Sequence, residues 1–387
     1  MIASHPFRLF ANPQFGTPGT VVLPEGGFRR AKAEITSWPG YAITPLLDLP
    51  ELAAQIGVAT VRIKDEAGRF GLGSFKALGG AYAVVVVLAN ELARRGIAAN
   101  TSAADLVAGR YRDATAGMTF TCATDGNHGR SVAWGAQRFG AACVIFVHEG
   151  VSQGRIDAIA QYGAQIRVVA GTYDDSVREA AAVAQANGWF VISDTAWDGY
   201  TEVPRDVMQG YRVMADEAVT QWRGSAPSHV FVQGGVGGVA AAVSAQMRAA
   251  YRPSPRLVVV EPEAAACLFA SAEQGRLTAV GGELDTLMAG LACGEPSPIA
   301  WQELGRAGFA FMSVPDAAAV DCMRLLARMG VVAGESGVAG LAGLLLAAAN
   351  PAARATLGLA DDSHVLLFST EGATDPALYQ QLVGAAA

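Results

Sequence analysis

Between residues 119 and 193, short apolar runs alternate regularly with longer stretches in which apolar and polar residues recur at helical spacing. Runs rich in β-branched and aromatic residues favour strands, and the longer stretches favour amphipathic helices. We expect strands at 119–124, 142–147, 165–169 and 190–193, and helices at 129–139, 152–162 and 173–187. Strands separated by helices of this length predict a parallel sheet with right-handed crossovers.

The same alternation continues on both sides of this region. Residues 58–64 alternate and include β-branched side chains, which predicts a strand, and residues 76–93 are apolar on most faces, which predicts a buried helix. The later predicted elements are helices at 200–217, 238–249, 316–329 and 337–348 and strands at 229–233, 256–261 and 364–369. We therefore predict a two-lobed α/β fold with open, mostly parallel, twisted sheets and helices on both faces.

The regular alternation also suggests domain boundaries. We expect a small α/β domain of residues 85–192, inserted into a large domain of residues 1–84 and 193–387. Residues 1–40 are rich in proline, glycine and aromatic side chains without clear periodicity, so we expect an extended arm packed on another lobe or on another subunit.

Composition narrows the class of protein. The chain has 387 residues, of which 51% are hydrophobic and 16% charged, so it can bury a large core like a compact enzyme. A net charge of −7 argues against a nucleic-acid partner. We expect no membrane span and a cytoplasmic protein, because no secretory signal is visible and apolar runs such as 83–89 are short. The five cysteines include no CxxC and no His/Cys cluster, so we expect no metal site, and whether Cys267 meets Cys293 stays open.

The first chemical candidate is a lysine. The chain has three lysines, and Lys76 follows the glycine-rich turn Gly71-Leu-Gly-Ser-Phe at the start of a predicted helix. An amine that is held against the backbone and partly desolvated can lose its proton near neutral pH and attack a carbonyl. A lysine taken alone is more often a solvated surface residue, but the glycine turn and the Ser-Phe-Lys context favour the reactive role.

The second candidate is a glycine-rich loop. Residues 230–233 form a buried strand that runs directly into Gly-Gly-Val-Gly-Gly and then into a helix. Glycine lets several backbone N–H groups converge, and the start of the helix adds partial positive charge, so a phosphate would fit there. The loop lacks the lysine of a Walker loop and the spacing of a dinucleotide site, and a structural tight turn is the alternative.

Three further loops follow predicted strands. Residues 124–129 read Thr-Asp-Gly-Asn-His-Gly, and their Asp or Asn could cap a helix, or their N–H groups could hold a substrate carboxylate. Asp194 could be a turn residue or a functional carboxylate. Ser369 and Thr370 bring hydroxyl groups to the end of the last strand. Because ligands of parallel sheets bind at the carboxyl ends of the strands, these loops could converge on one crevice.

Together these motifs resemble the fold type II pyridoxal phosphate enzymes, which include the serine and threonine dehydratases, tryptophan synthase β and the cysteine synthases. The order and spacing of the motifs match along nearly the whole chain. Within this group, the stretches Gly-Leu-Gly-Ser-Phe-Lys76, Asp125-Gly-Asn-His-Gly, Asp194-Thr-Ala-Trp and Ser369-Thr-Glu-Gly-Ala-Thr are similar to those of the diaminopropionate ammonia-lyases.

The resemblance implies a role for each motif. Lys76 would carry pyridoxal 5'-phosphate on its amine, and Lys76, Asp125 and Asp194 would be the catalytic residues. Asn127 would bind the phenolic oxygen of the cofactor, and Ser369 or Thr370 would face its pyridine nitrogen. The implied phosphate-binding residues are Gly234, Gly235, Val236, Gly237 and Gly238. The implied substrate-binding residues are Ser74, Thr124, Asp125, Gly126 and His128.

The resemblance also implies a substrate. The dehydratases usually have serine where this chain has Asp125, and a carboxylate there suits a second ammonium group, such as the one on Cβ of 2,3-diaminopropionate. Asp194 could make a similar contact, or one of the two aspartates could take the Cα proton, so that both the D and the L isomer are used. Elimination would give aminoacrylate and ammonia, and water would then release pyruvate and a second ammonia. We also expect a homodimer with a small amino acid as its substrate. The alternatives are a serine or threonine dehydratase and, in a different class, a non-catalytic phosphate- or nucleotide-binding protein.

Overall fold

The computed structural model describes residues 4–384, and its contacts divide the chain into two compact units. Unit 1 comprises the chain up to Val22, then Ile43–Gly68, and the chain from Met214 onward, and unit 2 comprises Leu23–Ala42 and Arg69–Val213. These divisions differ from the expected boundaries at 84/85 and 192/193. The reason is physical: a boundary at 84/85 would cut one continuous helix, α3 (Ala77–Arg94), which packs along the helices of unit 2.

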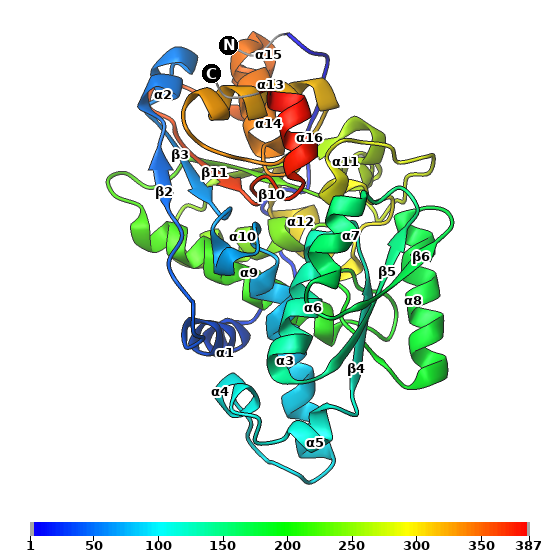
Figure 1. Cartoon of the computed structure of the whole chain (residues 1–387). Coiled ribbons are helices and arrows are strands. Elements are labelled where there is room, and N and C mark those ends of the chain that lie inside the picture. Colours follow the sequence, from blue (N-terminus) through cyan, green and yellow to red (C-terminus); the bar gives the residue numbers. More distant parts are fainter. Residues whose placement is uncertain (1–3, 385–387) are drawn as a thin grey trace. The chain divides into compact units, whose positions relative to one another are not determined.

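Unit 1 is built around a seven-stranded sheet (Figure 1). In spatial order the strands are β1 (Arg8–Ala11), β10 (Gly308–Val314), β9 (Arg256–Pro262), β8 (His229–Gln233), β11 (His364–Ser369), β3 (Thr60–Asp65) and β2 (Leu46–Asp48). The five central strands are parallel, and the edge strands β1 and β2 are antiparallel. The central strands are apolar and buried along almost their whole length, because helices shield parallel sheets from water.

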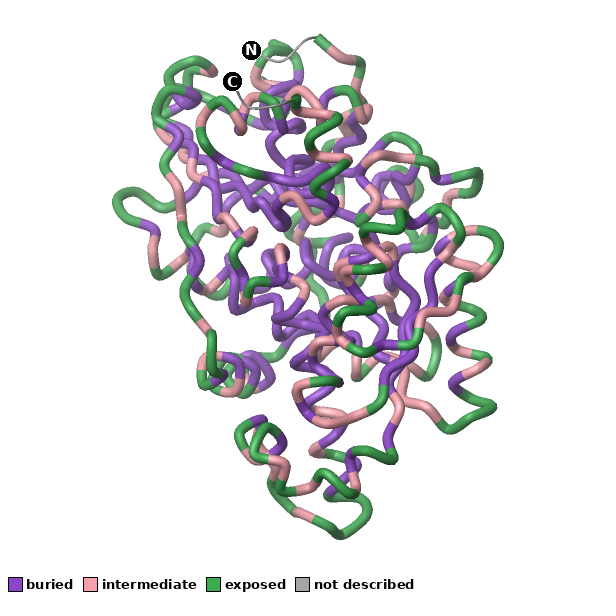
Figure 2. The backbone as a smooth tube through the Cα atoms, viewed as in Figure 1, coloured by how far each residue is buried: buried purple, intermediate pink, exposed green. Residues whose placement is uncertain are grey.

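Helices of unit 1 supply the rest of its core. They are α2 (Pro50–Ile56), α10 (Gly238–Ala250), α11 (Cys267–Gln274), α12 (Pro298–Ala307), α13 (Asp316–Arg328), α14 (Ala339–Ala349), α15 (Pro351–Leu357) and α16 (Pro376–Val383). Both α10 and α14 pack against β8. Apolar side chains of the strands, such as Phe231 and Leu367, are buried together with Leu344 of α14. Figure 2 colours the backbone by burial, and its interior segments are purple, which marks buried residues.

Unit 2 contains a four-stranded parallel sheet of order β6-β5-β4-β7, as the alternation of residues 119–193 predicted. Its strands are β4 (Thr119–Ala123), β5 (Ala142–His148), β6 (Gln165–Val169) and β7 (Phe190–Val191). Its helices are α1 (Glu25–Thr36), α3, α4 (Ala103–Val107), α5 (Arg112–Thr115), α6 (Asn127–Phe139), α7 (Gln153–Ala160) and α8 (Tyr173–Asn187), and α9 (Glu202–Gln221) continues from unit 2 into unit 1. The α/β class with mostly parallel sheets is thus confirmed.

The described residues 4–40 do not form the extended arm that we expected for residues 1–40. Strand β1 pairs with β10 at the edge of the large sheet, and α1 buries Phe28, Ala31 and Ile35 on one face. The apolar side chains of α1 are spaced by three and four residues, but the two glycines in its first turn weakened the helical pattern in the sequence.

Helix α3 is apolar over a longer stretch than the short run 83–89 that we considered in the sequence. Over its 18 residues it is long and apolar enough to cross a membrane, judged by length and composition. However, 67% of this stretch is buried by the surrounding protein, as is typical of a core helix. Burial, and not length, therefore distinguishes α3 from a membrane span.

Candidate active site

A strained turn places Lys76 at the start of α3. Gly71 and Gly73 have φ values of +71° and +74°, which side chains rarely tolerate, and Phe70 between the strand and the turn has φ of +51°. Ser74 is buried beneath this turn, and Lys76 is the residue directly before the first helical residue. The glycine-rich turn predicted from the sequence therefore does deliver a lysine to a helix start.

Two glycines in the first turn of α3 fix the position of this helix. A Cβ at Gly79 would lie 2.4 Å from the ring of Tyr211 in α9, and a Cβ at Gly80 would lie 2.0 Å from Oγ of Ser131 in α6. Only glycine allows these close approaches. The backbone that carries Lys76 is thus clamped between two other helices of unit 2.

The amine of Lys76 has a carboxylate partner. Its Nζ lies 2.5 Å from Oδ2 of Asp194, and the two side chains are 18% and 8% exposed. Burial opposes ionisation of Asp194, but the charges of Lys76 and His128 outweigh it and hold the pKa of Asp194 well below its ordinary value. A neighbouring carboxylate favours the ammonium form of a lysine, so the environment of Lys76 is an ion pair and not the purely desolvating one expected from the sequence.

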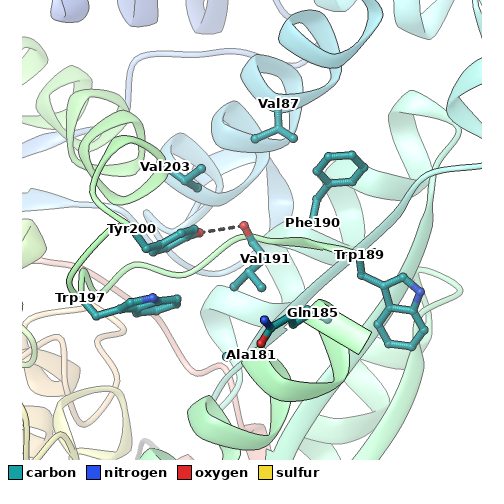
Figure 3. Close-up of a pocket in the computed structure, with 10 residues that line it drawn as sticks. Val87, Ala181, Gln185, Trp189, Phe190, Val191, Trp197, Tyr200 and Val203 are labelled. Atoms are coloured by element: carbon teal, nitrogen blue, oxygen red, sulfur yellow. Dashed lines mark hydrogen bonds between the residues drawn. The ribbon is translucent and has the colours of Figure 1, made fainter. Parts of the chain in front are cut away.

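The loop that carries Asp194 is fixed by Tyr200. The hydroxyl of Tyr200 donates to the carbonyl oxygen of Val191 at 2.7 Å and accepts from the N–H of Ser193 at 3.1 Å. Its ring stacks on Trp197 with 4.1 Å between centroids and 15° between planes. Figure 3 shows the stacked pair and the bond to Val191 at a cavity of about 470 Å³. The lining of this cavity is mainly apolar and includes none of the predicted site residues.

Asp125 follows β4 in the turn before α6. Its Oδ1 lies 2.9 Å from Nε2 of His148, and its side chain is 10% exposed. Burial raises the pKa of Asp125, and the hydrogen bond and charge of His148 partly offset this effect. Asp125 does not cap α6, because the N-cap residue is Gly126. The Oγ1 of Thr124 accepts the N–H groups of Gly126 and Gly129 at 3.0 and 2.9 Å. The hydroxyl of Thr124 is therefore already used by the backbone.

His128 and Asn127 lie in the first turn of α6. His128 is buried; its Nε2 is 2.7 Å from the carbonyl oxygen of Ile192, and its Nδ1 is 3.9 Å from Oδ2 of Asp194. Burial lowers the pKa of His128, and the charge of Asp194 partly offsets this effect. Unit 2 thus brings together Lys76, Asp194 and His128. Asp125 lies in the turn before α6, and its partner is His148.

The predicted phosphate loop lies in unit 1, between β8 and α10. Gly235 and Gly237 have φ values of +63° and +99°, and a Cβ at Gly234 would lie 2.5 Å from Cγ of Glu261. Within the described part of the chain, the N–H groups of Gly235, Val236 and Gly238 donate to no acceptor. Three N–H donors at a helix start, on a backbone with two glycines at positive φ, fit a phosphate group.

Glu261 and Cys267 border this loop. Glu261 accepts the N–H groups of Leu268 and Phe269 at 2.9 and 2.7 Å, and the Sγ of Cys267 lies 3.6 Å from the carbonyl oxygen of Gly235. Burial raises the pKa of Glu261 to about 8. A carboxyl group that is neutral at pH 7 does not repel an anion, so Glu261 is compatible with a phosphate site.

The hydroxyl residues lie beside the glycine loop. Strand β11 pairs with β8 in parallel, with Leu367 opposite Phe231, so the ends of the two strands are neighbours. Ser369 is fully buried, and the hydroxyl of Thr370 accepts from Nε2 of Gln233 at 3.2 Å. The structure therefore joins two of the predicted motifs in unit 1.

Sequence reasoning missed several residues of these sites: His148, Tyr211, Gln233 and Glu261. A signal existed for His148, because Ala123 pairs with Phe146, and Asp125 and His148 each follow two residues later. Tyr211 lies on α9, and its proximity to Lys76, with Nζ 5.8 Å from the ring centroid, depends on packing that no local pattern encodes.

Unit 2 has a lysine at a helix start, and unit 1 has a glycine-rich loop and hydroxyl groups at parallel strand ends. These features are those expected of the fold type II enzymes that use pyridoxal phosphate. The family described as pyridoxal-phosphate dependent enzyme matches residues 37–368, and the chain belongs to this family. The predicted fold type and cofactor are thereby confirmed.

Within this family, the chain is similar to the diaminopropionate ammonia-lyase of Escherichia coli K12, with 41% identity over 356 residues that cover 89% of this chain and 88% of that protein. Two crystal structures of the Escherichia coli enzyme match 100% of this chain and 100% of their own. The complex with D-serine gives a TM-score of 0.90 at 37% identity. The complex with an aminoacrylate–pyridoxal phosphate azomethine intermediate gives 0.89 at 37%.

Proposed function

We propose that the chain is a lyase that eliminates ammonia from both isomers of 2,3-diaminopropionate with pyridoxal phosphate as its cofactor. Two buried carboxylates, Asp125 and Asp194, in the same unit as the Lys76 amine carry this proposal. A substrate with two ammonium groups suits a site that is rich in carboxylates. The named activity of the Escherichia coli relative supports the same reaction.

The overall reaction requires one water molecule. The substrate loses its Cα proton and its β-amino group as ammonia, which gives aminoacrylate, and water converts aminoacrylate to pyruvate and a second ammonia. The aminoacrylate intermediate of the crystallised relative agrees with this order of reaction steps.

When bound, pyridoxal phosphate supplies an electron sink for the carbon from which the proton is removed. In the loop from Gly234 to Gly238, the N–H groups of Gly235, Val236 and Gly238 would hold its phosphate. Asn127 would hold its phenolic oxygen and Lys76 its aldehyde carbon. Ser369 or Thr370 would face the pyridine nitrogen. A neutral hydroxyl there leaves this nitrogen unprotonated, which favours prompt loss of a β-substituent over transamination.

Two isomers require two bases, because they present the Cα proton in opposite directions. We assign Lys76 to the L isomer and Asp125 to the D isomer. Asp194 would orient the Lys76 amine, which must lose its proton before it can act as a base. The N–H groups of the turn at Gly126, with Ser74, Thr124 and His128, would line the position of the substrate carboxylate. The complex of the relative with D-serine supports a site that accepts a D-amino acid.

Substrate comparison tests the proposal. Purified protein should release pyruvate from D- and L-diaminopropionate faster than from serine, and threonine should give little 2-oxobutyrate. A preference for serine or threonine would instead identify a dehydratase, and colourless protein that pyridoxal phosphate cannot reconstitute would identify a binding protein.

The lysine assignment has a separate test. Borohydride should remove the absorbance of the bound cofactor and modify the peptide that contains Lys76. Lys76→Ala should lose turnover of both isomers by at least about 100-fold, as expected for loss of a catalytic nucleophile or base. Lys32→Ala, on the exposed face of α1, is the matched control and should behave like the parent. Turnover by Lys76→Ala at the parent rate would remove the assignment.

We further propose a cytoplasmic homodimer that binds neither nucleic acid nor membrane. The net charge of −7 and the burial of α3 support the last two points. Sedimentation of the purified protein would test the dimer.

A further inference from the structure

We propose that His148 is a positioning residue for Asp125: its ring N–H holds the carboxylate ionised and oriented for turnover of the D isomer. The proposal deepens the proposed function, because it rests on the role of Asp125 given above. His148 lies at the carboxyl end of β5 and was not expected to take part in the site.

The sheet register places the two residues together. Strands β4 and β5 are parallel neighbours, with Ala123 opposite Phe146. Asp125 and His148 each lie two residues further along their segment. The side chains meet with Nε2 2.9 Å from Oδ1. The strand pairing therefore brings the turn that carries Asp125 beside the end of β5.

A backbone amide fixes which nitrogen of His148 carries the proton. The N–H of Gly150 donates to Nδ1 at 3.2 Å, so the neutral ring carries its proton on Nε2, the nitrogen that faces Asp125. His148 is therefore a donor to Asp125 whether the ring is neutral or charged. A hydrogen-bond donor to a buried carboxylate stabilises its ionised form.

The remaining oxygen of Asp125 is available for chemistry. The hydrogen bond of Asp125 to His148 uses Oδ1, and Oδ2 makes no hydrogen bond within residues 4–384. One oxygen is thus held by His148, while the other can take a proton or contact an ammonium group.

Other charged groups surround this pair, and they do not replace His148. Arg155 of α7 lowers the pKa of Asp125 through its charge, and Asp194 raises it. Around His148, the hydrogen bond to Asp125 raises the pKa most, burial lowers it, the charges of Asp125 and Glu149 raise it further, and Arg155 lowers it. His148 is the residue whose hydrogen bond offsets the burial of Asp125.

The kinetic test compares both isomers in one enzyme. His148→Leu removes the donor, so the pKa of Asp125 should rise, and the acidic limb of kcat/KM for D-diaminopropionate should move up by about 1 pH unit. The limb for the L isomer should stay in place. His148→Gln keeps an N–H donor and should restore most of the difference. An unchanged D limb in His148→Leu, or an equal shift for both isomers, would overturn the proposal.

The chain offers a matched control. His5 and Asp321 form the same pair, with Nε2 and Oδ2 2.9 Å apart, in unit 1. His5→Leu removes an equivalent ion pair away from the predicted site residues, so neither limb should move. A shift in His5→Leu equal to that in His148→Leu would show a general effect of losing a histidine and would overturn the proposal.

A spectroscopic test does not depend on turnover. The imidazole nitrogens of His148 can be followed by NMR in the holoenzyme, since the chain has only five histidines. Asp125→Asn should lower the pH at which His148 titrates, because the partner charge that raises its pKa is lost. An unchanged titration would overturn the contact. Failure of the parent to process diaminopropionate would instead overturn the proposed function, while this titration would still decide the His148 contact.

Discussion

Asp125 and Asp194 are two buried carboxylates of unit 2 with opposite tendencies to ionise. Asp194 is paired with Lys76, and its pKa lies below the ordinary value, whereas burial raises the pKa of Asp125. Titratable groups whose environments push their pKa values apart are suited to different roles in one reaction. A permanently ionised Asp194 is a counter-ion, and Asp125, which is closer to protonation, is the better base.

Replacement of Asp125 tests this division at the level of one residue. Asp125→Asn keeps the size of the side chain but removes the base, so turnover of D-diaminopropionate should fall by about 10² to 10⁴-fold. Turnover of the L isomer, measured in the same preparation as pyruvate release, should fall by much less. If parent and variant turned over each isomer at the same rate, Asp125 would have only a structural role.

At the level of elements, the sequence predicted the strands and helices of residues 119–193 well and the first forty residues poorly. Runs such as 142–147 are apolar throughout and lie in a buried parallel sheet, so local pattern and tertiary environment agree. Strand β1 has only four residues, and its pairing with β10 links positions about three hundred residues apart. No local pattern contains that pairing.

The close packing of α3 gives a prediction for one glycine. Gly→Ala in the interior of a helix normally stabilises a protein by about 1 kcal/mol. Here the new Cβ of Gly80→Ala would lie 2.0 Å from Oγ of Ser131, so overpacking should dominate and destabilise unit 2 by about 1–3 kcal/mol. Urea unfolding would measure the change in the free energy of unfolding.

Two companion variants make this prediction specific. Ser131→Ala removes the clashing oxygen, so the double variant should be more stable than the sum of the single effects implies. Gly281→Ala places its Cβ in open space and should change stability little. Gly80→Ala as stable as the parent would contradict the close approach of α3 and α6.

For the whole molecule, the motifs were predictable from the sequence, but their grouping was not. The sequence identified Lys76, the glycine loop and the hydroxyl residues because each combines an unusual composition with a position at the end of a strand or the start of a helix. The chain passes from one unit to the other several times, so that Leu23–Ala42 belongs to the same unit as Arg69–Val213. Such grouping follows from packing between distant segments, as does the meeting of Lys76 with Asp194 at 2.5 Å.

Cofactor removal gives a prediction for the whole molecule. A ligand that binds only the folded state stabilises it by about 2.7 kcal/mol at 100 times its Kd, so protein stripped of pyridoxal phosphate should have a lower Tm. Adding pyridoxal phosphate should restore the Tm. Pyridoxal, which lacks the phosphate, should restore much less if the loop from Gly234 to Gly238 binds that group. Equal recovery with both compounds would contradict the role of the loop.

The pairing of β4 with β5 has a consequence for reading other members of the family. Because of this pairing, the second residue after the strand partner of Ala123 is the neighbour of Asp125 in the fold. Some homologues would have a hydrogen-bond donor at this position, and others an aliphatic or cyclic side chain. These two groups would be adapted to different working pH values. A comparison of homologues at this one position would then predict their working pH. The lysine, the glycine-rich loop from Gly234 to Gly238 and the substrate would stay the same.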